Sequence, residues 1–250
     1  MPNALEIEGL SKRFGGLVAV DNVNLAVRQG DVHCVIGPNG AGKTTLLNLL
    51  SGTLPPSAGR VRFGGQDIAG LPTHRIAQLG IGRSFQRTNI FPEFSVYENC
   101  RLGAQARMKS SMRFFRPAER DEGVRERAER ALALTGLIAR RETRASALSH
   151  GEQRQLEIGV MLATEPAVLL LDEPMAGMSA DETTRMVDLL RRLKDGHTLI
   201  LIEHDMDAVF ALADVITVMV NGAVLASGTP QEIRASQAVQ DAYLGGDDIA

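Results

Sequence analysis

The sequence predicts an α/β fold with a mostly parallel sheet as its core, an N-terminal antiparallel β subdomain and an α-helical subdomain. Two observations predict the core. A Gly-rich loop at residues 37–44 lies between an apolar run and a helical pattern, and continuous apolar runs at 168–172 and 198–202 are typical of parallel strands buried on both faces. Helical periodicity between residues 96 and 144 predicts the helical subdomain.

The composition is ordinary for a soluble globular protein, with 250 residues of which 44% are hydrophobic and 23% charged. The net charge of −3 gives no indication of a nucleic-acid or membrane-surface partner. Cys34 and Cys100 are too few for a disulfide framework and fit a reducing, cytosolic setting. The N-terminus lacks the pattern of a signal peptide, and no apolar run of about 18 residues predicts a membrane span.

The N-terminal part alternates between apolar and polar residues at 5–7 and again at 17–27, which predicts antiparallel strands joined at Gly15-Gly16. A further short strand is expected at 61–63. Phe14 stands directly before the turn. In a nucleotide-binding protein, an aromatic ring here would stack on the base, a contact worth about 1 kcal/mol; the alternative is that Phe14 packs within the strand.

The segment from Gly37 to Thr44 fits the G-x-x-x-x-G-K-[ST] phosphate loop. A buried strand at 32–36 precedes it and a helix ending near Gly52 follows it, which is the context that the motif needs. Glycines let successive N–H groups point at an anion, Lys43 can reach the β- and γ-phosphates, and the Thr44 hydroxyl can bind Mg²⁺. The predicted nucleotide-binding residues here are Gly37, Pro38, Asn39, Gly40, Ala41, Gly42, Lys43, Thr44 and Thr45.

Residues 80–86 predict a strand that leads into a polar connector, and Gln86 matters only if the fold places it at the nucleotide. The helical region beyond is basic, with twelve Lys or Arg against six Asp or Glu between Arg101 and Arg144. This excess is typical of a solvated helical face, or else of a surface near lipid headgroups or a partner's acidic loops. Within it, residues 107–118 are expected to form a linker between two helices rather than a membrane-touching element.

Two later motifs add polar groups to the ends of predicted elements. Ser149 has the character of an N-cap for a helix running to about Thr164. The buried strand at 168–172 ends in two acids, which we expect on opposite sides of the strand. Asp172 can hold Mg²⁺, and Glu173 can orient or deprotonate a water.

The last part of the chain completes the alternation of strands and helices. The expected elements are a helix at 183–194, a strand at 198–202, a hairpin at 215–226 with a type I′ turn at Asn221-Gly222, a helix from 233 and a loose tail at 245–250. His204 follows the strand at 198–202, at the sheet edge where open α/β sheets bind ligands. It would bond a γ-phosphate or be structural.

Together these motifs resemble the nucleotide-binding subunit of ATP-binding-cassette transporters over nearly the whole chain. The phosphate loop matches Walker A, residues 149–153 the signature motif, and residues 168–172 Walker B, with Glu173 after it. Gln86 matches the Q-loop position and His204 the switch histidine. The resemblance implies a P-loop NTPase core, one cassette domain over residues 1–250 and a helical subdomain inserted at about 94–160.

The same resemblance implies ATP and Mg²⁺ as cofactors and assigns site residues. Glu173, His204 and Gln86 would be catalytic, and Thr44, Gln86 and Asp172 would bind Mg²⁺. The signature residues that would contact ATP held by an opposite subunit are Ser149, His150, Gly151 and Glu152.

Finer features are similar to the ATPase subunits of branched-chain amino-acid importers. They include the variant signature at 148–158, the stretch at 176–178, residues 202–206 and the closing residues 242–245. The sequence therefore indicates an ATP-hydrolysing subunit that energises uptake of branched-chain amino acids or related small polar solutes. The ATPase of a lipid or lipopolysaccharide exporter, and a DNA-repair-type ATPase head, are the alternatives; the second would have a long coiled coil before its signature, and none is present here.

Three positions depart from the wider family pattern. His150 replaces a usual glycine, Glu152 replaces a usual glutamine, and Ser179 stands at the D-loop position where aspartate is common. Because Glu152 would put negative charge near a phosphate, we expect its side chain to point away or to be neutralised.

The resemblance also implies partners and a location. Two such subunits face each other head to tail, so the partners would be a second ATPase subunit (a copy or a paralogue), transmembrane permease subunits and, indirectly, a substrate-binding protein. No nucleic acid is expected. The chain would lie at the cytoplasmic face of the plasma (inner) membrane, with the connector at 87–99, including Phe91 and Phe94, near the permease.

Overall fold

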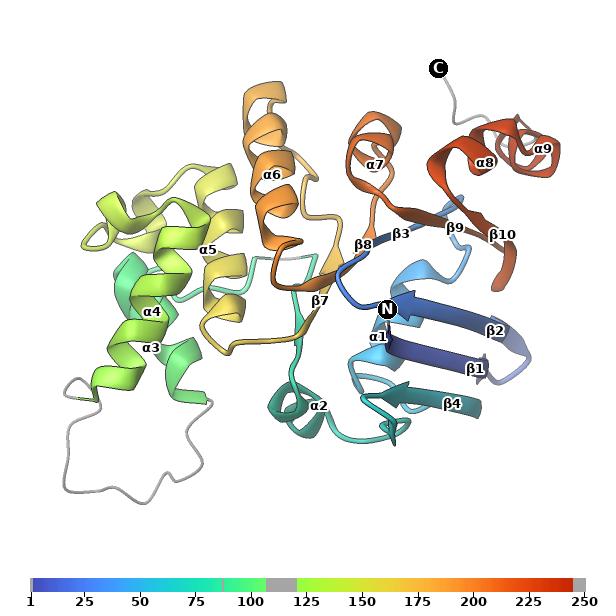
Figure 1. The fold of residues 1–250 in the computed structure, drawn as a ribbon, viewed down its shortest axis with the longest axis horizontal. Helices are drawn as coiled ribbons and strands as arrows, with labels where there is room; N and C mark the ends of the chain where they lie inside the picture. The colour runs from blue at the N-terminus through green and yellow to red at the C-terminus, as the bar shows by residue number, and fades with distance from the viewer. Residues whose placement is uncertain (1, 87, 107–120, 245–250) are drawn as a thin grey trace.

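The computed structural model describes residues 2–86, 88–106 and 121–244, and it contains two sheets (Figure 1). The first sheet has the order β2-β1-β4-β5 and is antiparallel. Its strands are β1 (Asn3–Phe14), β2 (Leu17–Arg28), β4 (Ala58–Phe63) and β5 (Gln66–Asp67). The register pairs Phe14 with Leu17 across Gly15-Gly16, so the predicted turn joins two strands that are longer than their alternation indicated.

The second sheet has six strands in the order β10-β9-β3-β8-β7-β6. They are β3 (Val32–Ile36), β6 (Ile81–Arg83), β7 (Val168–Asp172), β8 (Thr198–Ile202), β9 (Val215–Val220) and β10 (Ala223–Gly228). All neighbours are parallel except β9 and β10. In the turn of that hairpin Asn221 and Gly222 both have positive φ, +49° and +82°, as the predicted type I′ turn requires. The predicted α/β fold class is confirmed.

Each central strand contributes side chains to two apolar clusters, one on each face of the parallel sheet. In β3, Cys34 belongs to one cluster and Val35 to the other, and in β7 Leu169 and Leu170 divide in the same way. The cluster that contains Val35 includes residues of α1 (Lys43–Leu50) and of the antiparallel sheet, whereas the helices of the other face pack around the cluster that contains Cys34. Burial on both faces explains why these strands are continuous apolar runs.

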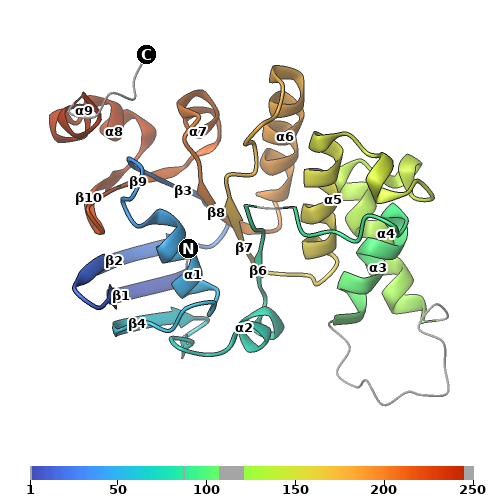
Figure 2. The same cartoon turned by 180° about the vertical axis from the view of Figure 1, so that it is seen from behind.

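Helices also flank the sheets beyond α1 (Figures 1 and 2). They are α2 (Thr73–Leu79), α6 (Ala180–Leu193), α7 (Met206–Leu212), α8 (Pro230–Ala235) and α9 (Gln237–Leu244). Helix α6 begins three residues before the predicted start because Ser179 caps it, and the expected C-terminal helix is two helices separated at Ser236. Sequence analysis missed α7, whose seven residues are too few to show a clear period.

Three helices form a separate group at one end of the molecule: α3 (Val96–Ala106), α4 (Glu122–Thr135) and α5 (His150–Leu162) (Figure 1). A Cβ on Gly103 of α3 would lie 2.3 Å from the Val160 carbonyl oxygen, so glycine permits the close approach of α3 and α5. The basic segment 107–118 and the tail 245–250 lie outside the described residues. In the part of the chain that is described, no helix is both long enough and apolar enough to cross a membrane.

Candidate active site

The phosphate loop between β3 and α1 has the backbone that its motif predicts. Gly37, Gly40 and Gly42 have φ values of +149°, +80° and +96°. A Cβ on Gly37 would lie 2.1 Å from the carbonyl oxygen of Met219, and a Cβ on Gly42 would lie 2.2 Å from that of Ala19. Glycine therefore supplies both the left-handed backbone and the room for the neighbouring main chain.

Helix α1 presents its N-terminus to this loop. It has no side-chain cap, so the N–H groups of its first turn stay available to an anion, and the helix end adds partial positive charge. The Lys43 Nζ donates hydrogen bonds to the carbonyl oxygens of Gly37 at 2.6 Å and Pro38 at 3.0 Å. Burial lowers the pKa of Lys43, while the nearby carboxylates of Glu173 and Asp172 act in the opposite direction. The loop is thus built for an anion of high charge.

A cavity of about 570 Å³ brings most of the predicted nucleotide-binding residues together. Of the predicted residues, those lining it are Phe14, Asn39, Gly40, Ala41, Gly42, Lys43, Thr44, Thr45, Gln86 and Glu173. Phe14 is 44% exposed, and Lys12 Nζ lies 5.1 Å from the centroid of its ring. An aromatic face and a phosphate loop therefore border one cavity, which suits a nucleotide in its chemistry.

Four residues that sequence analysis did not assign line the same cavity: Leu17, Val18, Ala19 and Asn221. They come from β2 and from the β9–β10 turn. The Gly222 N–H donates to Ala41 O at 3.1 Å, and the Asp21 N–H donates to Gly222 O at 2.8 Å, so this turn docks between the phosphate loop and β2. The sequence predicts the Asn-Gly turn, but it does not show that the turn packs against the phosphate loop and β2.

Asp172 ends β7 and is almost completely buried, 1% exposed. Its Oδ2 lies 3.8 Å from Arg83 Nη2, and its backbone N–H donates to Ser84 Oγ at 3.2 Å. Burial raises the pKa of the Asp172 carboxyl, and the Arg83 guanidinium opposes that rise. Its Oδ1 is buried with no hydrogen-bond partner in the described part of the chain, which leaves one carboxylate oxygen for a ligand.

Glu173 follows the strand in a left-handed conformation, φ +49°, with its N–H bonded to Ile202 O at 3.0 Å. This conformation is uncommon for a residue with a side chain and occurs often at functional sites. Because β7 ends at Asp172, strand alternation does not determine where the Glu173 side chain lies. The turn brings Glu173 into the cavity with Lys43 and Gln86.

Four residues predicted for this nucleotide site do not line the cavity: Gly37, Pro38, His204 and the buried Asp172. Gly37 and Pro38 do not line the cavity and contribute through their carbonyl oxygens to Lys43. His204 follows β8 and is exposed, its N–H bonded to Glu203 Oε2 at 3.3 Å, and it is not one of the residues that line the cavity. The structure therefore does not bring His204 together with Lys43 and Glu173 in this single chain.

The signature residues lie at a second cavity, at the start of α5. Ser149 caps the helix through a capping box with Glu152, as its sequence character predicts. The Ser149 hydroxyl and the Gly151 N–H both donate to Glu182 Oε1, at 3.2 Å and 3.1 Å. Ser149, Gly151, Glu152 and Glu182 line this cavity and not the one at Lys43.

The unusual signature side chains have partners within the chain. The Glu152 Oε2 accepts the Ser149 N–H at 2.9 Å and lies 3.4 Å from Arg140 Nη2, so its charge is neutralised as expected. His150 Nε2 lies 3.3 Å from Ala176 O, a contact across to the segment after β7. Ser179 caps α6, with Glu182 in a second capping box.

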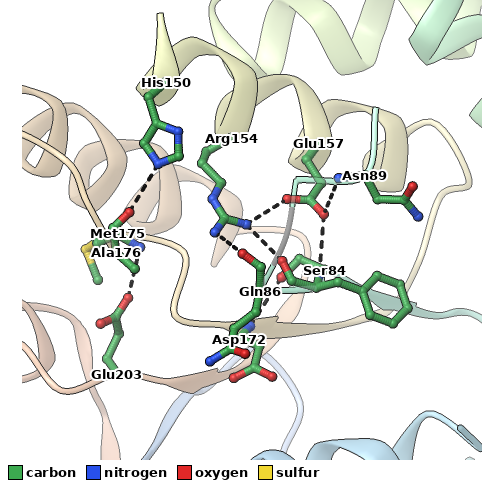
Figure 3. Close-up of polar contacts among 11 residues, drawn as sticks. Ser84, Gln86, Asn89, His150, Arg154, Glu157, Asp172, Met175, Ala176 and Glu203 are labelled. Atoms are coloured by element: carbon green, nitrogen blue, oxygen red, sulfur yellow. Dashed lines mark hydrogen bonds and ion pairs between the residues drawn. The ribbon is translucent and has the colours of Figure 1, made fainter. Parts of the chain in front are cut away.

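The loop that carries Gln86 is bound to α5 by two buried side chains that sequence analysis did not single out, Arg154 and Glu157 (Figure 3). Arg154 donates to the carbonyl oxygens of Phe85 and Gln86, and Glu157 accepts the N–H groups of Phe85 and Asn89. The sequence shows that Arg154 and Glu157 are three residues apart on a predicted helix. It does not show that they are buried against this loop.

These groups can bind a nucleotide phosphate through main-chain N–H groups and Lys43, and they place a carboxylate, Glu173, where it can act on a water near that phosphate. The comparisons with known proteins agree. A family model described as "ABC transporter" matches residues 20–176, and one described as "Branched-chain amino acid ATP-binding cassette transporter" matches residues 223–249.

The chain belongs to the ABC transporter family, and it is an ATPase subunit of that class. It is 41% identical to the high-affinity branched-chain amino acid transport ATP-binding protein BraF of Pseudomonas aeruginosa, covering 96% of this chain and 97% of that protein. The ADP conformation of MJ1267, an ATP-binding cassette of an ABC transporter, superposes with a TM-score of 0.88 at 32% identity, covering 98% and 100% of the two chains. A dimeric post-hydrolysis cassette, MJ0796 bound to ADP and Pi, superposes with a TM-score of 0.76 at 25% identity over 90% of this chain and 98% of that one.

Proposed function

We propose that this chain hydrolyses ATP to drive high-affinity uptake of branched-chain amino acids or related small polar solutes. The observation that carries the proposal is the cavity shared by Phe14, Lys43, Gln86 and Glu173. The cargo is proposed from the similarity to relatives named for branched-chain amino acid transport, which favours this cargo over a lipid.

Within the cavity each side chain has a proposed task. Phe14 stacks on the base, and the loop N–H groups with Lys43 bind the phosphates. Glu173 takes the proton of the attacking water, and Gln86 orients that water. His204 would bond the γ-phosphate after moving to the cavity. In this scheme the protein contributes positioning and charge neutralisation, which dominate phosphoryl transfer.

The oxygen donors present fit Mg²⁺. Asp172 Oδ1 is buried without a hydrogen-bond partner among the described residues, and Thr44 and Gln86 line the adjoining cavity. These three residues would hold the ion, which when bound neutralises charge on the β- and γ-phosphate oxygens.

We also propose that the active unit is a dimer. Ser149 and the Gly151 N–H lie at a cavity separate from Lys43, so they would serve a nucleotide bound to a second ATPase subunit, a copy or a paralogue. The dimeric relative supports this arrangement. His150 and Glu152 would flank that contact, and α3, α4 and α5 would form a helical subdomain at about 94–160 within a single cassette domain of residues 1–250.

The proposed membrane partners are permease subunits, supplied with cargo by a substrate-binding protein, at the cytoplasmic face of the inner membrane. Phe91 and Phe94 support a docking surface. Their rings are stacked, with centroids 5.4 Å apart, and the residues are 54% and 40% exposed. Paired exposed aromatic rings next to the Gln86 loop are typical of a contact surface.

The test is uptake by the transporter reconstituted with its permease subunits and substrate-binding protein in vesicles. Radiolabelled leucine should accumulate only with ATP and Mg²⁺, and Glu173→Gln should lower ATP turnover by roughly 10²-fold while ATP binding remains. Near-normal turnover of Glu173→Gln would contradict the role of Glu173. ATP-dependent transport of a lipid, with no accumulation of leucine, isoleucine, valine or another small polar solute, would contradict the cargo.

A further inference from the structure

Arg154 and Glu157 form a buried ion pair on α5, one helical turn apart. Their side chains are each 7% exposed, and Arg154 Nη1 lies 3.1 Å from Glu157 Oε2. Removing two charges from water is costly, and their mutual attraction offsets the cost only when further hydrogen bonds satisfy both groups. The partners of these two groups therefore explain how the pair is accommodated at this place.

Those partners are main-chain groups of the Gln86 loop (Figure 3). Arg154 Nη1 donates to Phe85 O at 2.8 Å, and Nη2 donates to Gln86 O. Glu157 Oε1 accepts the N–H groups of Phe85 and Asn89, each at 3.3 Å. The planar guanidinium and the carboxylate thus hold carbonyl and amide groups of one loop from one helix face.

The residue just before this stretch is held by the sheet instead. The Ser84 N–H donates to Leu170 O at 2.9 Å, and Ser84 Oγ accepts the Asp172 N–H at 3.2 Å. The chain therefore passes from attachment to β7 at Ser84 to attachment to α5 at Phe85 and Gln86. This junction lies next to Gln86, which lines the cavity with Glu173.

The same helix begins at the signature residues. Ser149 caps α5, and Arg154 and Glu157 lie in the same continuous helix of 13 residues. An α-helix transmits displacement along its axis with little deformation, because its main chain is hydrogen-bonded throughout. Ser149 and the side chains that hold the main chain of Phe85 and Gln86 therefore belong to one rigid element.

We propose that Arg154 and Glu157 are positioning residues for Gln86, which fix its main chain against α5 and thereby hold it at the cavity that Lys43 and Glu173 also line. The inference rests on the proposed function. Ser149 at one end of α5 contacts the nucleotide of the opposite subunit, and Gln86, bound to the middle of α5, lines the cavity for this subunit's own nucleotide. Arg154 and Glu157 thereby fix the main chain of the residue that is proposed to orient the attacking water.

The test uses Arg154→Lys. Lysine keeps the positive charge but lacks the planar guanidinium, which bonds two carbonyl oxygens and the Glu157 carboxylate at once. In the complex with the permease subunits we expect kcat to fall by about tenfold, with the KM for ATP changed by less than about twofold. Hydrogen exchange of the Phe85 and Asn89 amides in the purified chain should accelerate by about tenfold, since their acceptor is no longer fixed. Glu157→Gln, which can still accept those N–H groups, should show the smaller effect on both measurements.

Arg130→Lys is the matched control, because it makes the same substitution in an exposed ion pair of the helical group, Arg130 with Glu165. It should leave kcat and the two amides unchanged. The inference is overturned if Arg154→Lys keeps the parent kcat and the parent exchange rates. It is also overturned if ATP affinity and melting temperature fall together with kcat, because a merely structural role predicts that result. A parent complex without ATPase activity would instead contradict the proposed function, so the two failures are distinguishable.

Discussion

The carboxylate of Glu182 is hydrogen-bonded to the N–H of Gly151 at 3.1 Å, at the N-terminus of the signature helix. The same oxygen accepts the Ser149 hydroxyl, and the other oxygen accepts the N–H and the hydroxyl of Ser179, both at 3.1 Å. Hydrogen bonds from the main chain of Ser179 and Gly151 hold the pKa of Glu182 down at about 2, so it is ionised at neutral pH. The groups proposed to bind the opposite subunit's γ-phosphate therefore hold an anion of their own chain.

A γ-phosphate that binds Ser149 and Gly151 must compete with this carboxylate. We expect Glu182→Gln, in a Glu173→Gln background, to lower the ATP concentration required for dimerisation by roughly threefold to tenfold, because a neutral amide competes less well for N–H groups at a helix N-terminus. Asp181→Asn removes the neighbouring exposed acid and should have little effect. The measurement is analytical ultracentrifugation across an ATP titration, and an unchanged or raised ATP requirement for Glu182→Gln would count against competition.

The phosphate loop offers a matched pair of glycines. Gly42→Ala would place a Cβ 2.2 Å from Ala19 O, whereas a Cβ on Gly40 meets nothing within 4 Å, although both residues have positive φ. We expect Gly40→Ala to cost about 1 kcal/mol of unfolding free energy, from backbone strain alone. Gly42→Ala should cost at least about 3 kcal/mol, since strand β2 or the loop must also move. Urea unfolding of both variants is the measurement. Equal losses of unfolding free energy would show that the contact between a Cβ at position 42 and Ala19 O does not destabilise the fold.

The exposed rings of Phe91 and Phe94 provide a test of coupling to the permease. Replacing both by alanine should abolish most ATP-driven uptake while leaving the ATPase activity of the purified chain near the parent value, since neither ring lines the nucleotide cavity. Leu225→Ala, another large exposed apolar residue at 41% exposure, is the control on β10. Uptake that survives in the double variant would exclude these rings from the docking surface.

His33 gives the stability of the fold a predictable pH dependence. Burial lowers the pKa of His33 to about 4, and its Nε2 lies 2.7 Å from Thr217 Oγ1. The unfolded chain binds a proton near the ordinary pKa of about 6.5 that the folded chain excludes. The contribution of His33 to stability is therefore constant above that pH, and it lowers stability by up to about 3 kcal/mol as the pH drops to about 4.

Urea unfolding at pH 7 and pH 4.5 measures this effect. His33→Gln can still bond Thr217 but does not titrate, so its stability should change with pH by about 2–3 kcal/mol less than that of the parent. His74→Gln, at an exposed position, should retain the parent's pH dependence. If His33→Gln and the parent show the same pH dependence of stability, the pKa of His33 is not lowered in the folded protein.

The phosphate loop, the buried strands and the capped start of α5 could all be predicted from sequence, because each is specified by neighbouring residues. Gly42 and Lys43 are adjacent in a motif that determines local backbone, and Ser149 with Glu152 is a capping box within one turn. Strand β7 is a run of apolar residues that only a position between two layers explains.

What the sequence could not predict depends on how distant elements dock. Glu182 lies one residue before the helix predicted at 183–194, and only the packing of α6 beside α5 brings it to Gly151. Sequence analysis did not single out Arg154 and Glu157. They are buried against a loop that lies about 70 residues earlier in the chain, at sequence separations of 69 and 72 from Phe85. Asn221 enters the nucleotide cavity because the β9–β10 turn docks on the phosphate loop.

The central claim is that ATP is bound between two cassettes, with Lys43 and Glu173 from one and Ser149 and Gly151 from the other. The most direct measurement is size-exclusion chromatography of Glu173→Gln with and without ATP and Mg²⁺, alone and mixed with the second ATPase subunit of its transporter. The account predicts a shift from monomer to dimer that requires ATP and is lost in Ser149→Arg. Retention at the monomer position with ATP bound, both alone and in the mixture, would contradict it.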